Sequence, residues 1–248
     1  MLGGALSGIA TGTLLGLLGG GGSIIAVPIM IYMLGMQPKA AIGTSLVIVG
    51  LASLLAASSH FRNHSVLIST ALIFAVSGAL GSFAGARLAQ YISDVVQLTL
   101  FAVAMALVAL LMLRKRQPQS ETVDDVKSNS LPIMLSAGLG AGLLTGLLGV
   151  GGGFIIVPAL TMVLSVPIKK AIGTSLLVVG TNSMVGAISY GSSLNLTWAI
   201  LPFALGTLVA APIAGGVAHY IPQEKLKVSF AITLLGLSAW MLSNQFFK

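Results

Sequence analysis

The chain has 248 residues, of which 56% are hydrophobic and only 7% are charged, and its net charge is +7. The surface of a water-soluble domain needs many more charged residues than this. The composition therefore predicts a polytopic membrane protein surrounded by the lipid bilayer. The absence of cysteine excludes disulfides, thiolate metal sites and cysteine nucleophiles. No basic stripe with interleaved aromatics is present, so no nucleic-acid partner is expected. The N-terminus lacks a basic region, so we expect no cleaved signal peptide.

The first apolar run covers residues 2–34 and is interrupted by four consecutive glycines at 19–22. As one helix it would be about 50 Å long, whereas the hydrocarbon core is about 30 Å thick. Since glycine holds a helix weakly, we expect two half-helices joined by a turn of bare backbone. The length fits a re-entrant hairpin that enters and leaves on one face. Backbone without helical bonds survives at membrane depth only where protein or a water-filled cavity satisfies it.

Three membrane spans are expected next, at residues 40–59, 66–91 and 95–113. Gly78, Gly81 and Gly85 lie on one side of the second span, where they allow close helix packing. The polar stretch 114–130 is predicted to link two membrane domains, 1–113 and 131–248. The second domain has a broken run at 131–166 and spans at 171–190, 196–221 and 226–241. The predicted fold is therefore all-α.

The second half of the sequence repeats the first at an offset of 130 residues. Gly16–Pro28 returns as Gly146–Pro158 with 9 of 13 positions identical, and Lys39–Gly50 returns as Lys169–Gly180 with 9 of 12. Three crossings per copy would make the copies inverted repeats. Interrupted apolar segments at matching places in two halves are the best sequence indication of a transporter's binding site.

The basic residues predict the orientation in the membrane. With re-entrant runs, nine of the twelve Lys and Arg residues fall on the side of the linker. If each broken run crossed once, they would divide six and six, so the positive-inside rule favours the first arrangement. It places the linker in the cytoplasm and both termini outside, in the plasma (inner) membrane of a prokaryote. Two crossings per broken run would give the same division, so charge alone does not exclude ten spans.

The glycine turns are the first candidate site. Each turn would expose backbone N–H groups at the start of a half-helix, and a helix N-terminus attracts anions. Tight helix packing is the alternative explanation for such glycines. The candidate anion-binding residues of the turns are Gly20, Gly21, Gly22, Ser23, Ile24, Gly151, Gly152, Gly153 and Phe154.

Polar side chains follow each turn in the next span. The hydroxyls of Thr44, Ser45, Thr174 and Ser175 would either line the site or bond to their own helix backbone. Asn182 and Ser183 come two turns later in the second copy. A lone intramembrane asparagine is a candidate ligand or a bridge between helices.

Ionisable groups are scarce. We expect His60, Arg62 and His64 to be solvated at the end of a span, and Arg87 and His219 to reach the interface. All five acids fall in predicted loops, so proton-linked transport would need a histidine or the substrate to carry the proton. No paired carboxylates, metal-spaced histidines or phosphate-binding loop occur, so neither an enzyme nor a metal or cofactor site is expected.

With both glycine turns and both Ala-Ile-Gly-Thr-Ser-Leu blocks, the chain resembles the TauE/SafE family of membrane permeases from about Gly8 to Leu242. The resemblance implies an exporter of sulfite or organosulfonates with about eight membrane segments, which six spans and two hairpins match. We therefore expect a secondary transporter of small sulfur-containing oxyanions that works by alternating access. The alternatives are a passive anion channel and a structural membrane subunit without a solute path. The expected partner is a small anionic substrate, and a homodimer stays open.

Overall fold

The computed structural model describes residues 2–20, 22–63, 65–114, 131–148, 152–191, 198–218 and 220–246. Within these ranges the chain forms helices joined by short turns, without a β-strand. This confirms the all-α class.

The helix boundaries follow the predicted segments within a few residues. The first part of the chain forms α1 (Leu2–Leu18), α2 (Ser23–Pro28), the π-helix η1 (Ile29–Met33), α3 (Pro38–Arg62), α4 (Ile68–Ala89) and α5 (Asp94–Arg114). The second part forms α6 (Leu131–Leu148), α7 (Gly153–Pro158), the π-helix η3 (Ala159–Val163), α8 (Ile168–Ser189), the 3₁₀-helix η5 (Trp198–Ile200), α9 (Leu201–Ala218) and α10 (Gln223–Phe246).

Six helical segments of the described chain are long and apolar enough to cross a membrane. They are α3, α4, α5, α6, α8 and the continuous segment Trp198–Ala218, which joins η5 to α9. Their outward faces carry large apolar side chains, such as Val76 and Leu80 of α4. A surface of this kind suits hydrocarbon rather than water, so the helices form a multi-pass membrane protein.

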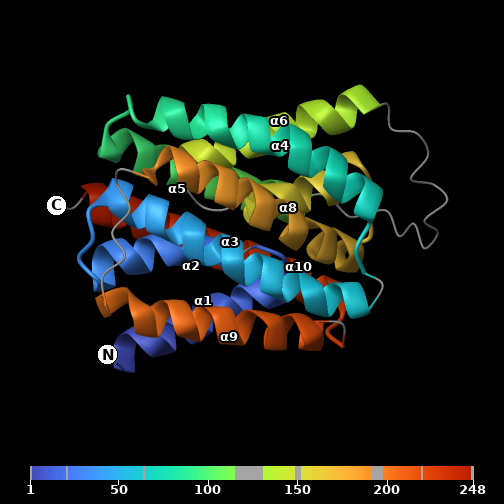
Figure 1. Cartoon of the computed structure of the whole chain (residues 1–248), viewed down its shortest axis with the longest axis horizontal. Coiled ribbons are helices and arrows are strands. Elements are labelled where there is room, and N and C mark those ends of the chain that lie inside the picture. The colour runs from blue at the N-terminus through green and yellow to red at the C-terminus, as the bar shows by residue number, and fades with distance from the viewer. Residues whose placement is uncertain are drawn as a thin grey trace.

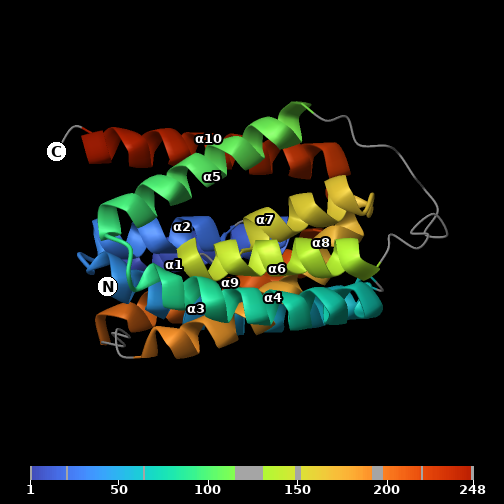
Figure 2. The ribbon, with the colours of Figure 1, turned by 90° about the horizontal axis from the view of Figure 1, so that it is seen from above.

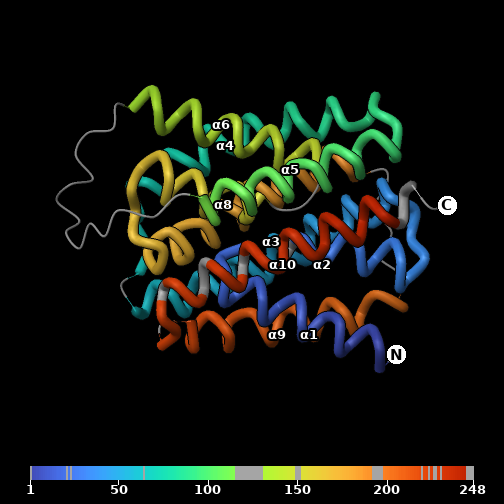
Figure 3. The backbone as a smooth tube through the Cα atoms, turned by 180° about the vertical axis from the view of Figure 1, so that it is seen from behind, coloured from blue at the N-terminus to red at the C-terminus, as the bar shows by residue number. Residues whose placement is uncertain are grey.

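The helices lie roughly side by side along the long axis of the molecule (Figure 1). Helices α5 and α10 pair as a separate outer layer on one side of the bundle (Figure 2). The start of α1 and the end of α10 lie at one end of the molecule, and α5 ends at the opposite end (Figures 1 and 3).

The packing partners of α1 and α6 come from the other part of the chain. Helix α1 packs along α9, and α6 packs along α4, while α3 and α8 pack against each other in the interior. Backbones approach closely at glycines, as predicted for α4. A Cβ on Gly81 would overlap the carbonyl oxygen of Leu139, and a Cβ on Gly85 would overlap that of Leu143. Glycine therefore sets the spacing between α4 and α6.

Both apolar runs are interrupted where the glycines predicted it. After its glycine break, the arm formed by α2 and η1 leads back to the end of the molecule where α1 begins, and α3 starts there (Figures 1 and 3). The corresponding arm, α7 and η3, leads to the opposite end, where α8 starts (Figure 2).

The second half of each arm is a π-helix, which the sequence reasoning did not predict. The π-helices begin directly after Pro28 and Pro158. Proline has no N–H to donate to the carbonyl four residues earlier, so the α-helical bonding pattern is disturbed at this point. Each arm then ends in a left-handed residue, Gly35 (φ 67°) or Ser165 (φ 53°). The amides of Met36 and Val166 bond back to carbonyls six residues earlier, which closes the helix ends.

Candidate functional site

The first glycine break is a true break in the helix. Gly19 (φ 66°) and Gly20 (φ 110°) adopt left-handed backbone conformations that side chains rarely tolerate. In the second break, Gly152 (φ 65°) does the same. Glycine is therefore required at these positions by backbone geometry.

The two breaks touch each other inside the bundle. A Cβ on Gly153 would overlap the Cα of Gly20, and it would lie 2.7 Å from Gly20 C and 2.9 Å from Gly19 O. Gly22 does not face the other break, because a Cβ there would overlap the carbonyl oxygen of Thr11 in α1. Of the predicted glycines, Gly20 and Gly153 are thus brought together.

Three of the predicted anion-binding residues cannot be placed in full. Gly21 and Gly151 lie outside the described residues, as does the side chain of Ser23.

The first turns of α2 and α7 carry no side-chain cap on their N–H groups. The side chains of Ile24 and Phe154, the second residues of α2 and α7, are buried in the apolar core. Phe154 packs edge to face on Phe101 of α5, with ring centroids 6.0 Å apart. Any polar interaction offered by these two residues therefore comes from their backbone.

The hydroxyls after the turns hold backbone in place. Ser175 Oγ lies 2.6 Å from Gly19 O and 2.8 Å from Ile172 O, so its single hydrogen bonds either the opposite glycine turn or its own helix. Ser45 Oγ donates to Ile42 O at 2.8 Å, as expected for a hydroxyl that bonds to its own helix.

Thr44 and Thr174, the threonines predicted to line the site, are fully buried. The Oγ1 of Thr174 accepts a hydrogen bond of 3.0 Å from the N–H of Leu67, in the turn before α4. Thr174 therefore anchors a connecting loop.

Three buried polar side chains on α3 and α8 have no hydrogen-bond partner in the protein: Ser53 on α3, and Asn182 and Ser183 on α8. All three are fully buried. The missing Cβ of Gly78 on α4 leaves the space that the Asn182 amide occupies. Buried polar atoms without partners are costly, so these side chains invite a functional explanation.

The prediction that His60 is solvated was wrong. Helix α3 continues to Arg62, beyond the predicted end of the span, and carries His60 inward until it is only 4% exposed. Its Nε2 lies 3.4 Å from Gly16 O. Arg62 and Arg87 are exposed, as expected, and Arg87 lies over the Phe83 ring. His64 and His219 lie outside the described residues.

A second polar contact was missed entirely. Gln97 of α5 is buried, and its Nε2 donates to Leu147 O (2.6 Å) and to the Tyr190 hydroxyl (3.2 Å). The Tyr190 hydroxyl in turn donates to Gly146 O at 3.2 Å. The sequence indicated this contact only by the single amide side chain in a largely apolar helix. These bonds secure the end of α6 just before the second break.

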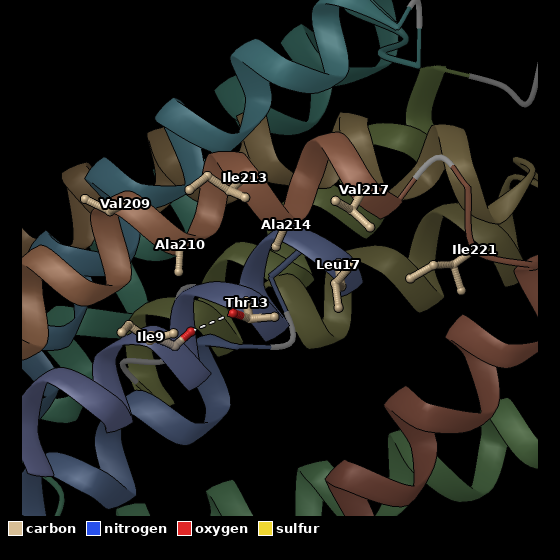
Figure 4. A pocket seen from close by; sticks show the side chains of 9 residues that line it. All are labelled: Ile9, Thr13, Leu17, Val209, Ala210, Ile213, Ala214, Val217 and Ile221. Atoms are coloured by element: carbon tan, nitrogen blue, oxygen red, sulfur yellow. Dashed lines mark hydrogen bonds between the residues drawn. The ribbon is translucent and has the colours of Figure 1, made fainter.

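An apolar groove opens between α1 and α9 (Figure 4). Its volume is about 450 Å³, and it is lined by residues such as Leu17, Val209 and Ile213. Thr13 points its hydroxyl at Ile9 O of its own helix, 2.8 Å away. A groove lined in this way suits hydrocarbon rather than an anion.

The long apolar helices and the two broken elements that meet among them define a multi-pass membrane protein. A family model described as "Sulfite exporter TauE/SafE" matches residues 4–241, so the chain belongs to this family. No solved structure matches the chain.

The chain is similar to proteins named as probable membrane transporters. One from Xylella fastidiosa (strain Temecula1) is 38% identical over 95% of this chain and 92% of the relative. Another, YdhB of Bacillus subtilis, is 28% identical over 90% of this chain and 92% of the relative. A third, MJ0441 of Methanocaldococcus jannaschii, is 28% identical over 83% of this chain and 79% of the relative.

Proposed function

We propose that the protein is a secondary transporter that exports small sulfur-containing oxyanions such as sulfite or organosulfonates. The observation that carries this proposal is the backbone contact between Gly20 and Gly153, which joins two broken helices inside an apolar bundle. Broken helices that meet in the interior are how many transporters form a substrate site. The family description supports sulfite and related anions as the substrate class.

The architecture that this function needs is a pair of inverted repeats, 1–113 and 131–248, joined by the cytoplasmic linker 114–130. Three observations support it. The sequence repeats at an offset of 130. The pairing of α1 with α9 mirrors the pairing of α6 with α4. The two broken arms return to opposite ends of the molecule (Figures 1 and 2), as two inverted re-entrant hairpins would.

The anion would bind to the N–H groups at the starts of α2 and α7. These groups carry partial positive charge and no side-chain cap, so they can accept an anion without a lysine or arginine nearby. Gly20 and Gly153 are in contact in the structure, so an anion can enter only when the two turns separate. Rocking one repeat against the other would open them first to one side and then to the other.

Asn182, Ser183 and Ser53 would supply side-chain hydrogen bonds to the anion on its way through. They are polar, buried and without protein partners, and they lie in the span that follows each turn. An oxyanion that accepts hydrogen bonds from them would offset the cost of keeping these groups dry.

The orientation proposed for the membrane places the linker in the cytoplasm and both termini outside. Arg62 at the end of α3, Arg114 at the end of α5 and Lys169 at the start of α8 belong to the side of the linker. Lys39 at the start of α3 and Arg87 near the end of α4 belong to the other side, where Lys39 Nζ donates to Gln90 O. This division follows the positive-inside rule.

Counterflow in proteoliposomes tests the proposal. Vesicles loaded with unlabelled sulfite, sulfoacetate, thiosulfate or sulfate should accumulate the same labelled anion when the protein is present, and the rate should saturate with concentration. A rate that rises linearly with the gradient, without counterflow, would indicate a passive channel instead. No flux of any of the four anions would leave a structural subunit as the explanation.

A further inference from the structure

One buried histidine takes the place in the first sequence copy that Tyr190 takes in the second. His60 and Tyr190 are 130 residues apart, and so are the carbonyls that they contact, Gly16 and Gly146. The His60 Nε2 lies 3.4 Å from Gly16 O, and the Tyr190 hydroxyl donates to Gly146 O at 3.2 Å. Each contact holds the last turn of the helix that precedes a glycine break.

The two side chains differ in how they titrate. A tyrosine hydroxyl stays neutral at physiological pH, whereas a histidine changes charge between about pH 5 and 8. The buried side chains of the described residues include no Asp, Glu, Lys or Arg. His60 is therefore the group among them that can gain a charge near neutral pH, and an intramembrane ionisable group usually marks an ion pathway.

The proton on His60 decides the strength of its contact with α1. The Nε2 can donate to Gly16 O only when it carries hydrogen, which a neutral ring protonated on Nδ1 lacks. The imidazolium carries hydrogen on both nitrogens and makes shorter, stronger bonds to a carbonyl.

The contact is directly connected to the proposed anion site. Gly16 lies in the last turn of α1, three residues before the left-handed Gly19, and the Gly20 N–H bonds to Leu15 O at 3.2 Å. Gly20 is the residue that touches Gly153. Protonation of His60 therefore changes a contact at the start of the first glycine turn. This is the turn that must move away from Gly153 before an anion can enter.

The surroundings of His60 come from three other helices. On α9, a Cβ at Gly215 would lie 3.2 Å from Nε2, and on α8 a Cβ at Gly173 would lie 3.1 Å from the His60 Cβ. Helices α1 and α9 contain no charged residue. The charged residues of the other two elements are Lys169 and Lys170 in the first turn of α8, and Lys39 and the exposed Arg62 at opposite ends of α3 itself. No carboxylate of these elements competes for the proton, and His60 lies within one turn of the exposed end of α3.

We propose that His60 is a proton-binding site that couples transport to the proton, an inference that rests on the proposed transporter function. A proton from water at the end of α3 adds to the unprotonated ring nitrogen and gives the imidazolium, which binds Gly16 O. The same proton returns to water when α1 moves away from α3. By linkage, separation of the two glycine turns changes the proton affinity of His60. Proton binding to His60 in turn changes the equilibrium between joined and separated turns.

The test uses the full chain in proteoliposomes and counterflow of sulfoacetate, because a sulfonate keeps its charge over the pH range. Rates are measured between about pH 5.5 and 8, the range over which a histidine titrates. The variants are His60→Gln, which keeps a neutral donor, and His60→Tyr, which copies the second sequence copy. The matched controls are His64→Gln and His219→Gln, the other two histidines of the chain.

The counterflow rates of wild type and of both controls should depend on pH in the same way. The rate should change by up to about tenfold per pH unit on the steep side of the curve. Both His60 variants should lose that dependence. A wild-type rate that is flat with pH, or a wild-type profile retained by His60→Gln, would overturn the proposal.

A second measurement separates this inference from the transport proposal. The melting temperature of purified wild type and of His60→Gln is compared over the same pH range in detergent. If the folded protein holds the proton on His60, the melting temperature of wild type rises relative to that of His60→Gln as the pH falls through the histidine range, even if no anion is transported. A difference that is constant with pH, or one in which wild type loses stability relative to His60→Gln as the pH falls, overturns the proton site whatever the counterflow result.

Discussion

The contact between the two glycine turns makes Gly153→Ala the sharpest single test of the site. Gly153 begins α7 and is not among the glycines with positive φ, so alanine is compatible with its backbone. The added Cβ would overlap Gly20 Cα and would lie 2.7 Å from Gly20 C. These neighbours are backbone atoms, so no side-chain rotation relieves the overlap.

Overpacking of this kind costs about 1–3 kcal/mol. For a chain of this size each kcal/mol lowers the melting temperature by about 2–4 °C. If the contact forms in one transport state only, the same energy shifts the equilibrium between states by about 5–150-fold. Counterflow of sulfite or sulfoacetate should fall accordingly.

The matched control is Gly140→Ala on α6, an exposed position where a Cβ would meet nothing within 4 Å. It should leave counterflow unchanged and should raise stability by up to about 1 kcal/mol, because alanine favours a helix more than glycine does. If Gly153→Ala melts and transports like the control, the two turns do not need to touch, and the proposed site is wrong.

Three further substitutions test other parts of the site. Gly152→Ala should lower stability by about 1–2 kcal/mol or more, because its φ of 65° is left-handed; thermal unfolding measures this. Ser175→Ala removes the donor 2.6 Å from Gly19 O and should cost about 1–3 kcal/mol, whereas Ser58→Ala, an exposed hydroxyl bonded to its own helix, should cost less than about 0.5 kcal/mol. Asn182→Leu should keep or raise the melting temperature, because the amide has no protein partner, while counterflow falls; unchanged counterflow would remove Asn182 from the anion path.

The sequence was sufficient to predict the helices and the two breaks, because each rests on local chemistry. Long apolar segments form spans, and consecutive glycines interrupt them. The roles of Gly81 and Gly85 in close packing also followed from their spacing. The π-helical arms were missed because the effect of Pro28 on the next turn depends on how the following residues pack.

The interactions between distant segments could not be predicted. Nothing near Ser175 in the sequence indicates that its hydroxyl reaches Gly19, 156 residues away. The burial of His60 depends on Gly215, which provides space on another helix. Such contacts arise when helices far apart in the sequence pack together, so only the three-dimensional arrangement reveals them.

The pairing of α1 with α9 has a consequence for the biosynthesis of the protein. The Thr207 Oγ1 of α9 lies 3.1 Å from Gly8 O of α1, 199 residues earlier, and 2.8 Å from Phe203 O of its own helix. At about 5–20 residues per second, a ribosome needs about 10–40 s to make the partner of a helix that has already emerged. During that interval the glycine-rich face of α1 has only lipid or chaperones to contact. Nascent chains released before residue 218 should therefore be early targets for membrane proteases.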